Sequence, residues 1–121
     1  MTLQDTDQAQ ANHARFVERV RASRQVWGLR SREGWANCPS NDVDGVDVLV
    51  FWSDRAYAAR HAKQEWSEYV ATPIDLGDFL DKWIPGMDRD GTRVGTNWDA
   101  HLCGLEMEPK TLGEQLTAPT P

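Results

Sequence analysis

The sequence has few cysteines, no long apolar run and no secretion signal, and each shortage excludes a class of protein. Cys38 and Cys103 are the only two cysteines among 121 residues and form no Cys-x-x-Cys pair, so a zinc knuckle or dithiol redox motif is excluded. No apolar run approaches the roughly 18 residues that a membrane-spanning helix needs. The N-terminus lacks the basic and apolar segments of a signal peptide. We therefore expect a cytoplasmic protein with two reduced, buried thiols and no membrane partner.

Motifs for nucleotides, metals and activated nucleophiles are also missing. The chain contains no GxGxxG, Walker or GxSxG pattern. Its histidines, His13, His61 and His101, stand singly, and its two Asp-rich turns lack the glutamate that closes a calcium loop. We expect no cofactor, no metal site and no catalytic residue. His13 lies on an apolar helix stripe, which predicts a hydrogen-bonded histidine, whereas His61 is expected to face solvent.

The net charge of −6 comes entirely from the second half of the chain. Residues 61–121 carry eleven acidic and five basic side chains, whereas residues 1–60 carry eight of each. This excess repels a phosphate backbone and excludes general nucleic-acid binding. An acidic half can equally attract a basic protein partner. The simpler alternative is that the charge keeps a small protein soluble.

The clearest structural signal lies between residues 46 and 66. Residues 46–52 are apolar except for Asp47 and rich in β-branched side chains, which predicts a central strand covered on both faces. Asp54 then predicts the N-cap of an alanine-lined helix that returns across the sheet. Asp47 is the only carboxylate inside this strand, so it is the one candidate for a buried acid. The alternative is that the pleat turns Asp47 to an exposed or hydrogen-bonded edge.

Hydrophobic periodicity predicts elements in the order α-β-β-β-α-(β)-α-β-β-α. Besides the helix after Asp54, the predicted helices span residues 8–23, 75–84 and 109–116, and the predicted strands span residues 25–30, 35–38, 46–52, 92–98 and 102–107. Asp7 is predicted to open the first helix, Asp75 to cap the third and Pro85 to end it.

This order predicts an α+β fold. We expect a mainly antiparallel sheet of about five to six strands with three to four helices packed on it. At 121 residues the chain suits a single domain, 1–121. Its ordered part is expected to span about residues 8–117, with a flexible polar tip and a flexible tail at 117–121.

Six tryptophans are an unusually high number for this length. Trp52 and Trp98 each end a predicted strand, and each is followed by a polar corner containing Asp54 or Asp99. If both strand ends open on one edge of the sheet, these four residues frame an amphipathic pocket or an anchor site for a protein partner. The alternative is that the large rings close the ends of a small core.

Several tryptophan-centred motifs run through the chain. They are Val26-Trp27-x-Leu29, Gly34-Trp35, Val48-Leu49-x-Phe51-Trp52, Glu65-Trp66-x-x-Tyr69, Asp78-Phe79-Leu80-x-x-Trp83-Ile84-Pro85-Gly86 and Gly95-x-Asn97-Trp98. With these motifs, the chain resembles the small bacterial proteins catalogued as domain of unknown function 2750 over about residues 12–117. The resemblance implies a stand-alone bacterial domain, and it supplies no activity, ligand or residue role.

From the sequence we expect a protein-binding or regulatory module without catalysis. It would use the Trp52/Trp98 edge or the acidic half, and neutralising a basic partner is one form of this role. The alternative is a small-molecule binder or small enzyme with a tryptophan-lined pocket and Asp47, His61 or Asp99 at its mouth. A third reading is self-association through the same edge.

Overall fold

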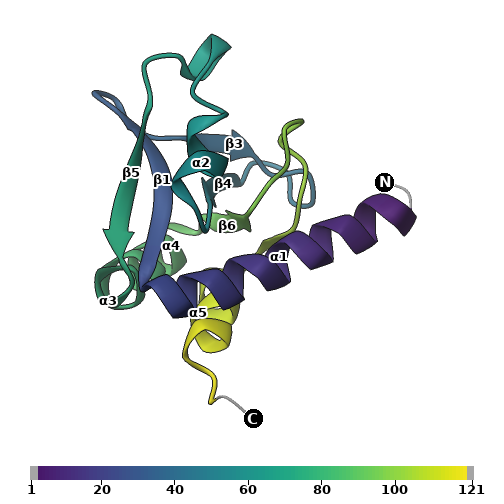
Figure 1. Ribbon diagram of the computed structural model, residues 1–121, viewed down its shortest axis with the longest axis vertical. Coiled ribbons are helices and arrows are strands. Elements are labelled where there is room, and N and C mark those ends of the chain that lie inside the picture. The colour runs from purple at the N-terminus through teal and green to yellow at the C-terminus, as the bar shows by residue number, and fades with distance from the viewer. Residues whose placement is uncertain (1–2, 120–121) are drawn as a thin grey trace.

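The computed structural model describes residues 3–119, apart from the side chains of residues 3–6 and 65, and it contains two small sheets (Figure 1). The first sheet is antiparallel, has the order β2-β1-β5, and consists of β1 (Gln25–Ser31), β2 (Gly34–Trp35) and β5 (Val70–Asp75). The second has the order β3-β4-β6-β7 and consists of β3 (Asn37–Pro39), β4 (Asp47–Phe51), β6 (Arg93–Thr96) and β7 (Glu106–Met107). Its central pair, β4 and β6, is parallel, and its outer pairs are antiparallel.

A β-bridge between Trp27 and Trp52 joins the two sheets. The amide of Trp27 donates to the carbonyl of Trp52 at 2.8 Å, and the reverse bond measures 2.7 Å. The predicted α+β class is confirmed, with two sheets in place of the single sheet expected. The returning strand predicted for residues 35–38 divides between them, because the chain leaves the first sheet at the buried Ala36 and enters the second as β3.

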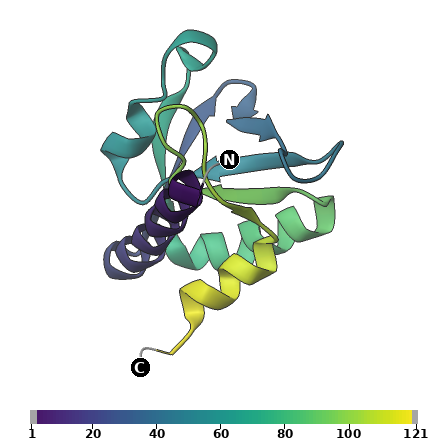
Figure 2. The ribbon, with the colours of Figure 1, turned by 90° about the vertical axis from the view of Figure 1, so that its right-hand side faces the viewer.

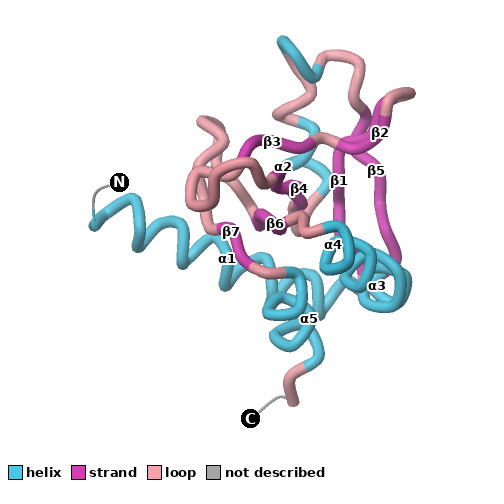
Figure 3. Tube along the Cα trace, turned by 180° about the vertical axis from the view of Figure 1, so that it is seen from behind, coloured by secondary structure: helices cyan, strands magenta, loops and turns pink. Residues whose placement is uncertain are grey.

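Most of the helical structure lies on one side of the strands (Figure 2 and Figure 3). The α-helical segments are α1 (Leu3–Ser23), α2 (Arg55–Ala59), α3 (Leu76–Asp78), α4 (Ile84–Asp90) and α5 (Pro109–Thr117). A π-helical turn, η2 (Phe79–Trp83), joins α3 to α4, and a 3-10 turn, η1 (Gln64–Trp66), follows α2. Helices α1 and α5 and the α3–α4 run form the helical layer, and α5 starts at Pro109 as predicted.

Strand β4 separates two apolar cores. Its Phe51 side chain faces the helix-side core, which consists of Phe16, Val20, Val26, Phe51, Ile74, Leu76, Phe79, Ile84, Met87, Val94, Leu112 and Leu116. Its Val48 and Val50 side chains face the α2-side core, which consists of Leu29, Ala36, Val48, Val50, Trp52, Ala58 and Trp98. Alternate residues of a strand point to opposite faces, so the predicted burial of this strand on both faces is confirmed. Asp47, at its start, is exposed, so the expectation that the pleat turns it to an exposed edge is confirmed, and the candidate buried acid is ruled out.

The first two helices differ from their predictions. Helix α1 already begins at Leu3, so Asp7 lies inside the helix and does not open it. Helix α2 is only five residues long, so it does not return across the sheet as predicted. The side chain of Asp54 makes no capping hydrogen bond to it. Instead, the Asp54 carboxylate accepts two bonds from the Arg19 guanidinium, at 2.8 and 2.9 Å, which explains why it is turned away from the helix amides.

The helical run after β5 begins as predicted and ends later than predicted. Asp75 accepts hydrogen bonds from the amides of Gly77 and Asp78, at 2.9 and 3.4 Å, so the predicted N-cap is confirmed. Pro85 does not end the run, which continues to Asp90. In a regular α-helix a proline ring clashes with the carbonyl four residues earlier, and the wider π-helical turn before Pro85 relieves that clash. Gly91, with φ of 72°, closes the run instead.

The two ends of the chain are described only in part. Residues 1–2 and 120–121, on which part of the predicted flexible tip and tail falls, lie outside the described residues. Residues 3–7 belong to α1, so the helix extends further toward the N-terminus than predicted. Across residues 3–119, no helix combines the length and apolar character needed to cross a membrane.

Candidate functional site

The carboxyl ends of β4 and β6 lie side by side, because the two strands are parallel and pair Phe51 with Thr96. The two polar corners follow directly, one at Ser53 and Asp54 and the other at Asn97. Both strand ends therefore open on one edge, which is the condition on which the predicted site at Trp52 and Trp98 depends. In open sheets, ligands bind outside the carboxyl ends of parallel strands, which directs attention to this edge.

Asn97 ties the two corners and α1 together. Its side-chain oxygen accepts from the amide of Ser53 at 2.8 Å, and its side-chain nitrogen donates to the Ser53 hydroxyl at 3.0 Å and to the carbonyl of Asn12 at 3.2 Å. Its φ of 47° is a left-handed conformation that asparagine tolerates better than most residues. The sequence placed Asn97 in the corner but gave no sign that it holds the edge together.

The indole rings of Trp52 and Trp98 point into the α2-side core. Their exposed fractions are 0% and 2%, and their N–H groups donate to the carbonyls of Trp98 and Leu105 at 3.1 and 2.8 Å. Two glycines make room for Trp98, since a Cβ on Gly95 or Gly104 would lie 2.6 or 2.4 Å from its ring atoms. An exposed tryptophan anchor is therefore wrong for this structure, and the alternative that large rings close the core is right.

A groove runs between α1 and this edge, and we call it the α1 groove. It consists of two adjacent pockets of about 660 and 330 Å³, the wide and the narrow part, which share Gln8, Asn12 and Asp99. The wide part is also lined by Ala9, Asn41, Asp42, His101, Cys103 and Gly104. The narrow part is also lined by Arg15, Trp52, Tyr57, Arg60 and Asn97. Of the four predicted site residues, Trp52 and Asp99 thus line the groove, while Trp98 belongs to the α2-side core and Asp54 bonds Arg19.

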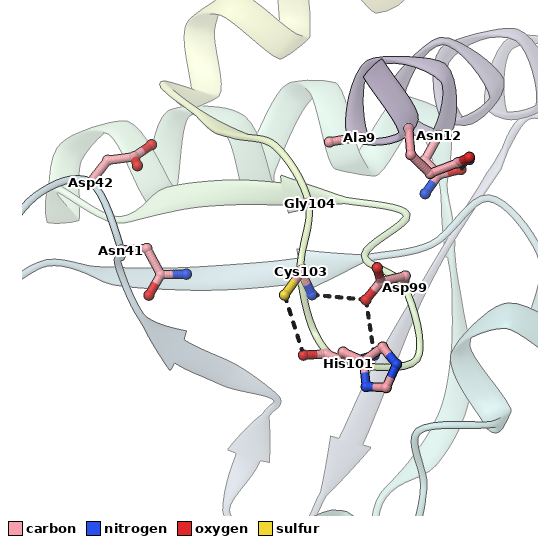
Figure 4. A pocket seen from close by; sticks show the side chains of 9 residues that line it. Ala9, Asn12, Asn41, Asp42, Asp99, His101, Cys103 and Gly104 are labelled. Carbon is pink, nitrogen blue, oxygen red and sulfur yellow. Dashed lines mark hydrogen bonds between the residues drawn. The ribbon is translucent and has the colours of Figure 1, made fainter. Parts of the chain in front are cut away.

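In the wide part, the carboxylate of Asp99 shapes the loop between β6 and β7 (Figure 4). Its Oδ1 accepts from the amides of His101 and Cys103 at 2.9 and 3.1 Å, and the thiol of Cys103 lies 3.6 Å from the carbonyl oxygen of His101. Cys103 is exposed, so its predicted burial is wrong, and Cys38 is half-buried; neither forms a disulfide. Within the part of the chain that the structure describes, no hydrogen bond joins the Cys103 thiol to an imidazole.

The opposite wall is fixed by Glu106, whose side chain is only 3% exposed. Its carboxylate accepts from the Nε of Arg93 at 2.9 Å, from the amide of Asn41 at 3.2 Å and from the Ser40 hydroxyl. These bonds hold the loop that presents Asn41 and Asp42 to the groove. No pattern in the sequence indicates this role for Glu106, because its partners Ser40 and Asn41 lie more than sixty residues away along the chain.

His61 lies behind the groove rather than in solvent. It is 5% exposed and stacks on Trp52 with ring centroids 4.9 Å apart, so its predicted exposure is wrong. Burial, and then the charge of Arg60, lower its pKa below the ordinary 6.5, while the carbonyl of Trp98 opposes the shift. His61 is therefore neutral at pH 7, and among the described residues its Nε2 has no hydrogen-bond partner. His13 is hydrogen-bonded, as predicted. Its ring bonds the Thr96 hydroxyl at 2.7 Å and the Gln115 side chain at 2.6 Å.

The side chains that the structure describes include no group of three or more His, Cys, Asp or Glu residues placed to hold a metal ion. The model of the family described as "protein of unknown function (DUF2750)" matches residues 13–116, in agreement with the resemblance found from the tryptophan motifs. Comparison with curated proteins and with solved structures gives no match.

Proposed function

The chain belongs to this family of unknown function, and we propose that it is a non-catalytic binding module whose α1 groove holds a small polar molecule. The observation that carries the proposal is the groove itself, which lies at the carboxyl ends of the parallel strands β4 and β6. Its combined volume is in the range of ordinary small-molecule sites.

The lining of the groove supports a polar ligand. Side-chain amides from α1 and from the loop after β3 surround the space, together with the carboxylates of Asp42 and Asp99. The amide of Gln8 donates to the side-chain oxygen of Asn12 at 2.9 Å, which holds both side chains along the groove. Polar groups fixed in this way give a ligand its orientation.

A partner protein, the first expectation from the sequence, has less support. One of its two expected surfaces was an exposed patch holding Trp52 or Trp98, and both rings are buried. Val43 and Val70 are the large apolar side chains with high exposure among the described residues, and they belong to different segments, the loop before β4 and the start of β5. Binding to a basic partner and self-association remain predictions.

We also propose that the protein works in the bacterial cytoplasm. The family resemblance supports the bacterial origin. The two unbridged cysteines support a reducing compartment.

A ligand screen with a blocked groove tests the proposed function. The thermal midpoint of the protein would be measured against a library of polar metabolites, for the natural sequence and for Asn12→Trp, which fills the space shared by both pockets. The matched control is Gln10→Trp, because Gln10 is exposed on the same helix but does not line the groove. A ligand bound in the groove stabilises the natural protein and Gln10→Trp but not Asn12→Trp.

Two outcomes would overturn the proposal. If every stabilising compound also stabilises Asn12→Trp, then ligands bind elsewhere. If none stabilises the natural protein, and a protein partner is captured by Asn12→Trp as well as by the natural sequence, the groove is not the binding site.

A further inference from the structure

The narrow part of the α1 groove contains two arginines without a carboxylate partner. Gln8, Asn12, Arg15 and Arg19 recur at helical spacing, so they share one face of α1. Arg19 is neutralised by Asp54, but Arg15, one turn earlier, makes no ion pair with any side chain that the structure describes. Arg15 therefore presents a positive charge to the narrow part, whose wall it forms.

The second arginine approaches from the opposite wall. Arg60 follows α2, and its guanidinium stands over the Tyr57 ring at 5.6 Å from the ring centroid. This cation–π contact holds the guanidinium at the rim without neutralising its charge. No carboxylate within the described part of the chain forms an ion pair with Arg60. Two guanidinium groups from separate elements thus line a single pocket of about 330 Å³.

The remaining charge of the pocket limits the ligand. Asp99 is the one carboxylate in the lining of the narrow part, and its Oδ1 already accepts two backbone amides. Two arginines and one aspartate leave a net charge of +1, which suits a singly charged oxyanion better than a doubly charged one. A carboxylate also matches the planar fork of a guanidinium, with two parallel hydrogen bonds.

We propose that the narrow part binds the carboxylate of a small organic acid between Arg15 and Arg60. This inference rests on the proposed function, since it assigns one end of the molecule in the α1 groove. The rest of the ligand extends into the wide part, where Asp42, Asp99 and the side-chain oxygen of Asn41 accept hydrogen bonds. The ligand is therefore a carboxylic acid whose body carries hydroxyl or amine donors.

Titration with simple anions tests the carboxylate end directly. The ¹⁵N-labelled full chain would be titrated with sodium acetate and, separately, with sodium phosphate, at constant ionic strength maintained with sodium chloride. Acetate should give saturable shifts in the NMR signals of Arg15, Arg60 and the Asn12 side chain, with a millimolar Kd. Phosphate should bind more weakly than acetate.

Three substitutions distinguish acetate binding between Arg15 and Arg60 from a general attraction to surface charge. Arg15→Gln and Arg60→Gln should each weaken acetate binding by roughly tenfold, because each removes charged hydrogen bonds. Arg15→Lys keeps the charge but loses the fork, so its Kd should fall between those of the natural protein and Arg15→Gln. The matched control is Arg32→Gln, which makes the same change of charge at an exposed position in the β1–β2 turn and should leave the Kd unchanged.

Three results would overturn the inference. They are equal weakening in Arg32→Gln, acetate shifts that do not saturate, and tighter binding of phosphate than of acetate. The metabolite screen distinguishes a failure of this inference from a failure of the proposed function. A metabolite that stabilises Arg15→Gln and Arg60→Gln as well as the natural protein, but not Asn12→Trp, leaves the groove as a binding site and removes the carboxylate end.

Discussion

The two cores on either side of β4 differ in chemistry. The helix-side core consists of aliphatic and aromatic side chains from α1, the α3–α4 run and α5, together with strand residues. The α2-side core contains Trp52 and Trp98, and three buried polar residues, Ser53, His61 and Asn97, lie beside it, whereas the buried Thr96 bonds His13 of α1. Burying polar groups opposes folding unless each finds a partner. The difference indicates that the helix-side core supplies most of the stability, while the α2-side core positions the groove.

The largest effect should follow from a cavity in the helix-side core. Phe79 is fully buried and meets Phe51 edge to face, with ring centroids 5.1 Å apart. Phe79→Ala should lower the free energy of unfolding by about 3–5 kcal/mol, as measured by urea denaturation. The control Val70→Ala removes methyl groups from a side chain that is 64% exposed, so it should change the free energy of unfolding by less than about 0.5 kcal/mol. A loss for Phe79→Ala as small as that of the control would contradict the assignment of stability to this core.

A smaller effect should come from crowding the α2-side core. A methyl group on Gly104 would lie 2.4 Å from the Trp98 ring, so Gly104→Ala should lower the free energy of unfolding by about 1–3 kcal/mol. It should also alter the near-ultraviolet circular dichroism of the tryptophans. Gly113→Ala is the matched control, because its methyl group would meet only the Ile84 side chain, at 3.4 Å, inside α5. That variant should be neutral or more stable by up to about 1 kcal/mol.

The smallest effect should be a pH dependence confined to the α2-side core. The lowered pKa of His61 means that the folded protein binds fewer protons than the unfolded chain below the ordinary value of 6.5. The contribution of His61 to stability is therefore complete above that value and is lost as the pH falls through the lowered pKa. Arg60 and Lys63 act in the same direction, and Asp99 opposes them.

His61→Phe tests this dependence, since it keeps a ring on Trp52 and removes the titrating group. Relative to the variant, the natural protein should lose unfolding free energy as the pH falls below the ordinary histidine pKa of 6.5. His101→Phe serves as the control, because His101 is exposed in the loop between β6 and β7. The stability of this variant should follow that of the natural protein. Parallel curves for the natural protein and His61→Phe would show that His61 is not held neutral by burial.

Local signals in the sequence were sufficient for part of this structure. The Asp75 cap depends on amides two and three residues away, and the stripe that positions His13 depends on helical spacing. The Asp75 cap and the His13 stripe are each determined by neighbours along the chain. The meeting of the two polar corners depends instead on the parallel pairing of β4 with β6, which the sequence did not predict.

The features that define the groove depend on distant residues. Trp98 turns inward because Gly95 and Gly104 both leave room for its ring, and no local pattern joins those two glycines. His61 is buried because Trp52, nine positions earlier, offers a ring to stack on. Arg15 is one of several arginines in the sequence of α1, and only the position of Arg60 across the groove distinguishes it. Such long-range contacts are visible only in the folded structure.

The π-helical turn before Pro85 has a consequence for how the chain tolerates insertions and deletions. A π-helical turn holds one residue more than an α-helical turn spanning the same path. Deleting one residue within Phe79–Trp83 would therefore shorten this turn to an α-helical one and leave the later side chains facing as they do now, so Ile84 and Met87 would stay in the helix-side core. Pro85 would then follow an ordinary α-helical turn, where its ring clashes with the carbonyl four residues earlier. The extra residue of the π-helical turn is therefore required by Pro85 and not by the packing of the helix.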